Sequence, residues 1–238
     1  MALDYYKAVV TDIIDESPTV KRFFLEFPEL DVFEYQAGQY VKVDMPIDDK
    51  KTYRQYSIAS EPVGENKIEL LIVLNPVGKG TAYLFNEVKI GTELKVSKAL
   101  GRFVLPKDLD KEICFVCTGV GLAPFRSMYL DVLNKAKDNQ GIHLVFGTRT
   151  EDDLLYEEEL IELDKKFENF HYYPTLSRSG DTWKGNKGYV HDIYKDIFKD
   201  QRNAKFYLCG WDIMVSEAKK NLKEMGYERK DILFEKYD

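Results

Sequence analysis

The period of the apolar residues changes once along this chain, between residues 105 and 110. Before that point, short and partly alternating runs of β-branched and aromatic residues are separated by Gly, Pro, Asp and Asn. After it, short apolar runs alternate with amphipathic stretches of helical period. The first pattern is typical of an antiparallel barrel or sandwich, and the second of repeated βα units. We therefore predict two domains, at residues 1–106 and 107–238.

The first domain is predicted to be an antiparallel six-stranded β-barrel with one helix, at residues 81–87. Its strands are expected at residues 6–14, 20–27, 40–44, 55–59, 67–74 and 93–97. The second is predicted to be an α/β domain with a parallel sheet, a fold that binds ligands at the carboxyl ends of its strands. Its strands are expected at residues 113–117, 142–146, 170–176, 206–209 and 232–234, with helices at 125–137, 154–167, near His191 and at 212–225.

The charge and hydropathy of the chain exclude some classes of protein. The 238 residues include 34 Lys and Arg against 41 Asp and Glu, and the resulting net charge of −7 argues against a general nucleic-acid binder. The longest apolar runs, at residues 70–74 and 113–117, fall far short of the ~18 residues of a membrane-spanning helix. Asp4 and Lys7 interrupt the start of the chain, where a signal peptide is apolar. We expect no membrane span and a cytoplasmic location.

The three cysteines do not form a closed set of disulfides. Cys114 and Cys117 have CxxC spacing, but they fall in an apolar strand that points them to opposite faces, so we interpret them as core residues. An iron–sulfur cluster needs about four thiolates, so we expect no metal site here and any such centre on a partner.

The second domain opens with a strand that runs through a glycine turn into a helix. Thr118, Gly119, Gly121 and Pro124 lie in this turn. Glycines let the backbone approach a pyrophosphate, whose charge is favoured by the helix start, and Pro124 suits a first helical turn. Pro124 also replaces the third glycine of the dinucleotide fingerprint, so a simple tight turn is the alternative.

The first domain carries Arg54, Tyr56 and Ser57 at the start of a predicted strand. Strand alternation places Arg54 and Tyr56 on one face and Ser57 on the other. A guanidinium that binds two phosphate oxygens beside a flat phenol suits a flavin nucleotide. An ordinary barrel strand with an exposed arginine is the alternative.

A second glycine-containing turn precedes the predicted helix of the first domain. Gly78, Gly80 and Thr81 lie at this helix start, which is able to hold a second phosphate. A helix cap with no ligand is the alternative.

Taken in order, these motifs resemble those of the ferredoxin–NADP reductase family of flavoproteins, along essentially the whole chain. The first domain matches the family's RxYS and GxxS/T motifs, and the second its GxGxAP turn, GxR strand end, CGxxxM turn and acidic-x-aromatic tail. The matching residues are Arg54, Tyr56, Ser57, Gly78, Thr81, Gly119, Gly121, Ala123, Pro124, Gly147, Arg149, Cys209, Gly210, Met214, Glu235 and Tyr237.

The resemblance implies FAD in the first domain. Arg54 would bind the flavin pyrophosphate, Tyr56 would lie on the isoalloxazine, and Ser57 would hydrogen-bond near N5. Thr81 and the backbone of Gly80 would hold the second phosphate.

The resemblance implies a pyridine nucleotide in the second domain. The turn at residues 118–124 would bind its pyrophosphate, and Cys209 and Gly210 would face the nicotinamide. Ser57, Cys209 and Glu235 are then expected to shape the hydride-transfer site. A buried strand end for Cys209 and a core position for Met214 are the alternatives.

The choice of coenzyme depends on four residues, Ser177, Arg178, Lys187 and Tyr189. In the NADP-selective branch of the family, a Ser-Arg pair at a strand end is followed by Lys-x-Tyr, and two cations, a hydroxyl and a phenol suit an adenosine 2′-phosphate. Residues 183–185 and 188–190 also resemble the loop of NAD-using electron-transfer reductases. We favour NADP(H) over NAD(H).

The end of the chain departs from the plant-type branch, in which the stacking aromatic is the last residue. Here Asp238 follows Tyr237, and the tail resembles that of bacterial oxygenase-coupled reductases. Whether Tyr237 covers the flavin is therefore left open.

The resemblance implies an FAD enzyme that passes electrons between NAD(P)H and a ferredoxin-like or flavodoxin-like carrier. The alternatives are an NAD(P)H-dependent flavin reductase, the reductase component of an oxygenase system, and a flavin-binding electron-transfer or regulatory subunit without turnover. Lys50 and Lys51 are candidate contacts of an acidic partner, or part of a solvated loop.

Overall fold

The structure is a computed structural model that describes residues 4–47 and 50–237. The side chains of Lys50 and Lys51, the predicted contacts of an acidic partner, lie outside the described residues, as does Asp238. The chain divides into two compact units. The first is Met1–Val104 with Ala123–Asp131, and the second is Leu105–Leu122 with Val132–Asp238.

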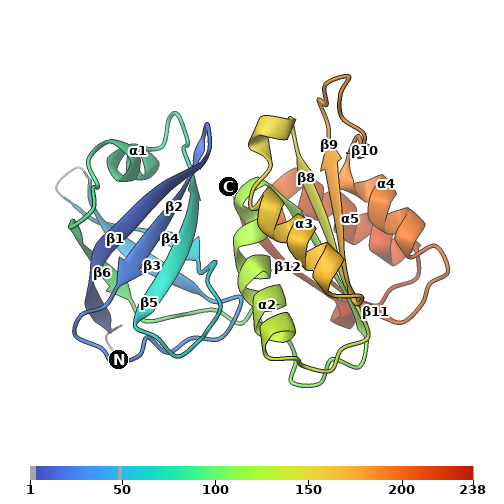
Figure 1. Ribbon diagram of the computed structural model, residues 1–238, viewed down its shortest axis with the longest axis horizontal. Helices are drawn as coiled ribbons and strands as arrows, with labels where there is room; N and C mark the ends of the chain where they lie inside the picture. The colour runs from blue at the N-terminus through green and yellow to red at the C-terminus, as the bar shows by residue number, and fades with distance from the viewer. Residues whose placement is uncertain (1–3, 48–49, 238) are drawn as a thin grey trace. The chain divides into compact units, whose positions relative to one another are not determined.

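The first unit contains an antiparallel sheet. Within residues 4–47 and 50–104 it has six strands in the order β4-β3-β6-β1-β2-β5, with a helix between β5 and β6 (Figure 1). The edges of this sheet are joined where Ile58, just after β4, bridges to Leu70 in β5, and the sheet thereby closes into the predicted barrel. The elements are β1 (Tyr5–Ser17), β2 (Val20–Glu26), β3 (Tyr40–Ile47), β4 (Lys50–Ser57), β5 (Lys67–Val73), α1 (Lys79–Asn86) and β6 (Glu93–Ser97).

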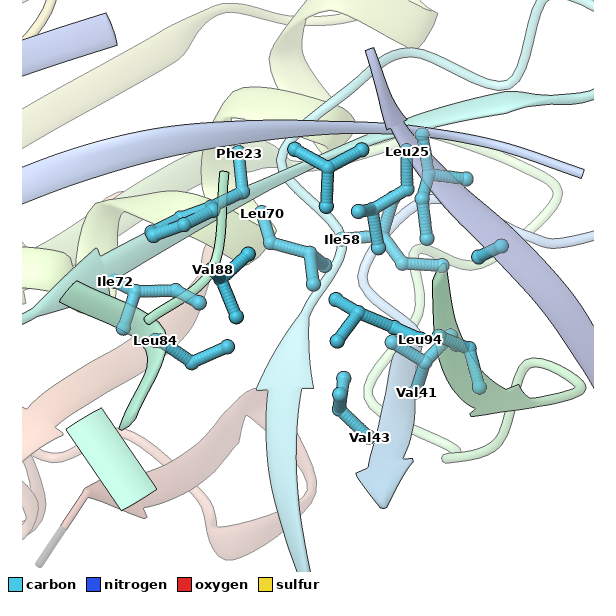
Figure 2. Close-up of a cluster of buried hydrophobic side chains, with 14 of the residues drawn as sticks. Phe23, Leu25, Val41, Val43, Ile58, Leu70, Ile72, Leu84, Val88 and Leu94 are labelled. Atoms are coloured by element: carbon cyan, nitrogen blue, oxygen red, sulfur yellow. The ribbon is translucent and has the colours of Figure 1, made fainter. Parts of the chain in front are cut away.

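Alternation of apolar and polar residues explains how these strands pack. In β3, Val41 and Val43 are buried while their chain neighbours are only partly so. Figure 2 shows these two valines with Phe23, Leu25 and Leu70 among the side chains of one buried cluster. Burial of each such side chain contributes ~1.5–3 kcal/mol. The apolar residues of the alternating pattern that predicted these strands therefore form the core of the barrel.

Strand β4 begins earlier than predicted. Residues 50–53 were expected to lie outside the strand, yet they pair with β3 from Ile47↔Lys50 to Asp44↔Tyr53. These residues lack the apolar alternation on which the prediction was based, and their backbone pairing with β3 makes them part of the strand. The prediction that Arg54 and Ser57 lie at the start of a strand is therefore wrong, because Ser57 is the last residue of β4.

The second unit contains the predicted parallel sheet. Within residues 105–237 it has six strands in the order β10-β9-β8-β7-β11-β12, and the helices follow strands as βα units (Figure 1). Its elements are β7 (Glu112–Thr118), β8 (Ile142–Thr148), α3 (Glu157–Lys166), β9 (Phe170–Leu176), β10 (Asn186–Lys187), α4 (Val190–Ile197), β11 (Ala204–Trp211), α5 (Asp212–Glu224) and β12 (Ile232–Tyr237). The helix that follows β7 along the chain, α2 (Leu122–Asn134), belongs for most of its length to the first unit.

The central strands of this sheet are covered on both faces. The five inner residues of β7 are all buried, as expected of a strand in a parallel sheet. Cys114 and Cys117 are among them, and burial raises the pKa of both thiols, so their interpretation as core residues is confirmed. Among the described residues, no helix has the length and apolar character required to span a membrane.

Candidate functional site

Arg54 and the start of α1 meet at Gly80. A Cβ atom placed on Gly80 would lie 3.1 Å from Cγ and 3.5 Å from Nε of Arg54. The absence of a side chain at Gly80 therefore lets the arginine pass across the first turn of the helix. Nη1 of Arg54 donates to the carbonyl of Tyr53 at 2.9 Å, which orients the guanidinium. A cation and the positive end of a helix dipole thus converge, although they come from distant parts of the chain.

The turn before α1 is held by Thr81. Its hydroxyl accepts a hydrogen bond from the backbone N–H of Asn75 at 3.0 Å, and it has the carbonyls of Asn75 and Gly78 as possible acceptors at 3.2 Å. The side chain of Asn75 accepts from the N–H of Val77 at 3.1 Å. Among the described residues, no side chain caps this helix start. The first-turn N–H groups of a helix point outward, so this turn presents backbone donors that suit a phosphate.

Tyr56 and Ser57 lie on opposite faces at the end of β4. Tyr56 is paired with Val41 of β3 and packs against the barrel core. Burial raises the pKa of its hydroxyl, so the phenol remains neutral. Ser57 is paired with Tyr40 and is only 6% exposed. The predicted alternation of Tyr56 and Ser57 is therefore present in the register of β3 and β4.

Glycines interlock two turns at the carboxyl ends of β7 and β11. A Cβ atom on Gly121 would lie 2.4 Å from the carbonyl oxygen of Cys209, and one on Gly210 would lie 2.4 Å from Oγ1 of Thr118. Gly119 has a φ of 51°, a conformation that favours glycine. The backbones thus approach too closely for any other residue. The turn leads directly into α2, where Pro124 is the third residue and lies in the first helical turn.

The end of β8 joins the same edge of the sheet. A Cβ atom on Gly147 would lie 2.6 Å from Cγ1 of Val190 and 3.4 Å from Cγ2 of Thr118. Arg149 follows this strand, and its guanidinium lies 6.0 Å from the ring centre of Trp211. The predicted GxR and glycine-turn residues are therefore brought together.

The four predicted coenzyme-selecting residues lie at the carboxyl end of β9 and beside it. The N–H groups of Ser177 and Arg178 donate to the carbonyls of Thr148 and Arg149, at 3.0 and 2.8 Å. Lys187 pairs with the last residue of β9, and Tyr189, at the start of α4, is 71% exposed. Two cationic residues and an exposed phenol thus lie on the segments around the end of β9.

The other end of this edge holds Cys209 and the tail. Cys209 is fully buried, and burial raises the pKa of its thiol. Its partner in β12 is Glu235, and that of Trp211 is Tyr237. Met214 is 8% exposed and belongs to the hydrophobic core of the second unit, as its alternative interpretation predicted.

Sequence reasoning missed a buried ion-pair network in the first unit. Glu69 in β5 is 4% exposed and accepts from Nε of Arg22 at 2.6 Å and from Nη1 of Arg126 at 3.0 Å. Arg126 also donates to the carbonyl of Ala59 at 3.0 Å. The available signal was a lone acidic residue in the apolar run of β5.

The family models and relatives that match this chain agree with its geometry. The model described as "Oxidoreductase FAD-binding domain" matches residues 7–105, and "Oxidoreductase NAD-binding domain" matches residues 115–220. The chain is 31% identical over 229 residues to ferredoxin–NADP reductase B of Sorangium cellulosum (strain So ce56), with 93% of each covered.

A second relative is longer than this chain. The phenol hydroxylase P5 protein of Acinetobacter pittii (strain PHEA-2) is 34% identical over 235 residues, which cover 98% of this chain but 65% of that protein. The chain therefore spans just under two thirds of the length of this relative.

A solved structure shares the fold. A ferredoxin NADP+ reductase from Neisseria gonorrhoeae with bound FAD and NADP superposes with a TM-score of 0.85 over 99% of both chains, at 22% identity. The family models, the Sorangium relative and the order of motifs together show that this chain belongs to the ferredoxin–NADP reductase family, as an oxidoreductase with an FAD-binding domain followed by an NAD-binding domain.

Proposed function

We propose that this protein is an FAD-dependent oxidoreductase that passes electrons between NAD(P)H and a ferredoxin-like or flavodoxin-like carrier. The observation that carries the proposal is the convergence of Arg54 with the start of α1 at Gly80, which fits a diphosphate. We assign FAD to residues 1–106 and the pyridine nucleotide to residues 107–238. Bound FAD would supply the exchange between two-electron hydride transfer and single-electron steps.

In this proposal, the residues of the first unit bind and orient the flavin. Arg54 neutralises the pyrophosphate, and the N–H groups around Gly80 and Thr81 bind its second phosphate. Thr81 also keeps the turn in shape through its bonds to residues 75 and 78. The neutral ring of Tyr56 lies on the isoalloxazine, and Ser57 donates a hydrogen bond near N5.

The residues of the second unit bind the pyridine nucleotide. The turn of Gly119 and Gly121 receives the pyrophosphate, and the end of β11 at Cys209 and Gly210 faces the nicotinamide. Glu235 lies beside Cys209 and helps to shape the transfer site. NADP(H) is favoured because cations and a phenol gather at the end of β9, where a 2′-phosphate would be neutralised.

A second candidate is the reductase component of an oxygenase system. The similarity to the phenol hydroxylase P5 protein favours it, since 98% of this chain aligns with that relative. Both candidates take electrons from NAD(P)H and differ in the acceptor.

The test is to purify the chain, record its visible spectrum, and measure NADPH and NADH oxidation with ferredoxin, flavodoxin or free flavin as acceptor. A bound flavin spectrum and reduction of a carrier protein with FAD retained support the proposal. Turnover that follows the concentration of added free flavin, with carrier proteins inert, would instead make the protein a flavin reductase. A colourless protein that binds no flavin would overturn both.

A further inference from the structure

Arg149 and Trp211 make a contact that crosses the nucleotide-binding turn. Strand β7 lies between β8 and β11 in the sheet. Arg149 directly follows β8, and Trp211 is the last residue of β11. Strands two places apart in a sheet are separated by roughly 10 Å, so the 6.0 Å contact between guanidinium and indole closes that distance. The pair therefore passes over the carboxyl end of β7, where the turn of Gly119 and Gly121 begins.

The backbone of Trp211 is fixed by a hydrogen bond, whereas the residue is largely exposed. Its N–H donates to Oγ1 of Thr118 at 3.4 Å, and Gly210 before it is packed against the same threonine. The residue is nevertheless 63% exposed. The barrel and sheet cores do not use this indole, and a large aromatic left exposed beside an arginine suits a planar or charged ligand.

The order of strands assigns each end of the contact to a different half of a dinucleotide. Arg149 accepts the backbone hydrogen bond of Arg178, so it belongs to the side of the edge with the candidate 2′-phosphate residues. Trp211 follows Cys209 and Gly210, on the side proposed for the nicotinamide. The proposed pyrophosphate turn lies between them.

We propose that Trp211 is a positioning residue for the nicotinamide half of the pyridine nucleotide, and that Arg149 leaves its ring for the pyrophosphate when a dinucleotide binds. The indole then forms one wall beside the nicotinamide riboside, while the guanidinium exchanges a cation–π contact for a charge-assisted hydrogen bond. This inference rests on the proposed binding of NAD(P) at residues 118–124, and it gives a role to Trp211, at a position that the CGxxxM motif leaves unspecified.

The experiment uses the flavin-loaded protein and oxidised NADP+, which binds without turnover. The chain has two tryptophans, so Trp183→Phe leaves Trp211 as the single reporter and serves as its own reference. We expect a saturable change in tryptophan fluorescence on titration with NADP+ in Trp183→Phe. In Trp183→Phe/Arg149→Gln, the starting emission should differ and the change on binding should shrink.

Calorimetry separates the role of Trp211 from nucleotide binding as such. Trp211→Ala should raise the dissociation constant for NADP+ at least fivefold and leave that for adenosine 2′,5′-bisphosphate within twofold of the parent value. Trp211→Phe should recover most of the lost affinity for NADP+. Ile213→Ala is the matched control, because Ile213 is 70% exposed two residues further along and should bind NADP+ like the parent.

The outcomes distinguish the proposed role of Trp211 from the proposed binding of a pyridine nucleotide. Parent-like binding of NADP+ to Trp211→Ala, or an equal loss for both ligands, overturns the role of Trp211 while nucleotide binding stands. A parent protein that binds neither NADP+ nor NAD+ in the calorimeter overturns the proposed function itself.

Discussion

Cys209 and Glu235 lie side by side as direct partners in the parallel pairing of β11 with β12. The thiol is fully buried, and burial together with the charge of Glu235 raises its pKa. Burial also raises the pKa of Glu235 to about 7. The side of the edge proposed for the nicotinamide therefore holds a neutral thiol next to a carboxyl group that titrates near neutral pH.

The first prediction concerns the pH dependence of stability. The pKa of Glu235 is higher in the folded protein than its ordinary value of 4.5, so the folded state binds more protons than the unfolded chain between pH 4.5 and about 7. The contribution of this residue to the free energy of unfolding therefore falls as the pH rises through that window. Glu235→Gln removes this dependence. We expect its free energy of unfolding, relative to the parent, to increase by on the order of 1–3 kcal/mol from pH 4 to pH 8. Urea unfolding at both pH values measures it. Exposed Glu168→Gln is the control, and an unchanged difference for Glu235→Gln would contradict the prediction.

The second prediction concerns FAD. Arg54→Ala leaves the charge of the proposed diphosphate unmatched, so it should weaken FAD binding by about 1.5–3 kcal/mol. Flavin retained after gel filtration, followed by titration of the apoprotein, measures the loss. Arg102→Ala, at another exposed arginine of the barrel, should keep FAD as the parent does. Equal retention by both variants would remove Arg54 from the flavin site.

The third prediction concerns the interlocked turns. Gly121→Ala places a methyl group where only 2.4 Å separates it from the carbonyl oxygen of Cys209, so the two backbones must move apart. We expect a loss of about 1–3 kcal/mol in unfolding free energy and weaker binding of both coenzymes. At Gly180, the nearest atoms to a new Cβ are 3.8 Å away, so Gly180→Ala should be close to neutral. Thermal unfolding and NAD(P)+ titration compare the two, and a neutral Gly121→Ala would show that the turns are not rigidly joined.

The fourth prediction concerns coenzyme choice. Only NADPH carries the 2′-phosphate, so replacing Arg178 and Lys187 with Gln should raise the KM for NADPH and spare that for NADH. Steady-state rates with a carrier protein and each coenzyme test this. An equal loss for NADPH and NADH would assign both side chains to structure.

The fifth prediction concerns the buried network in the first unit. Glu69→Gln removes the carboxylate that joins Arg22 and Arg126, and it leaves buried guanidinium charge with weaker compensation. We expect a loss of about 3–5 kcal/mol. The exposed pair of Lys7 and Glu93 is the control, since Glu93→Gln should cost no more than ~1 kcal/mol. Urea unfolding of both variants decides it, and similar values would mean that burial of Glu69 adds nothing.

The two sheets and most of the motif positions could be predicted from the amino-acid sequence alone. The alternation of apolar residues in β3, as in Val41 and Val43, and the continuous apolar run of β7 can each be recognised from residues that are close together in the chain. The glycine turn at Gly119 and Gly121 was also predictable, because its backbone requirement is local and its place between a strand and a helix follows from the same pattern.

The contacts between residues far apart in the chain could not be predicted in this way, because they follow from the arrangement of the strands in space. Residues 50–53 join β4 because β3 offers them backbone partners, and their own side chains carry no such signal. Arg54 reaches Gly80, and Arg149 reaches Trp211, because the register and the order of strands bring them together. These contacts depend on the position of each strand in its sheet, and a local sequence pattern carries no information about that position. The period of the apolar residues, by contrast, depends only on residues that are neighbours along the chain.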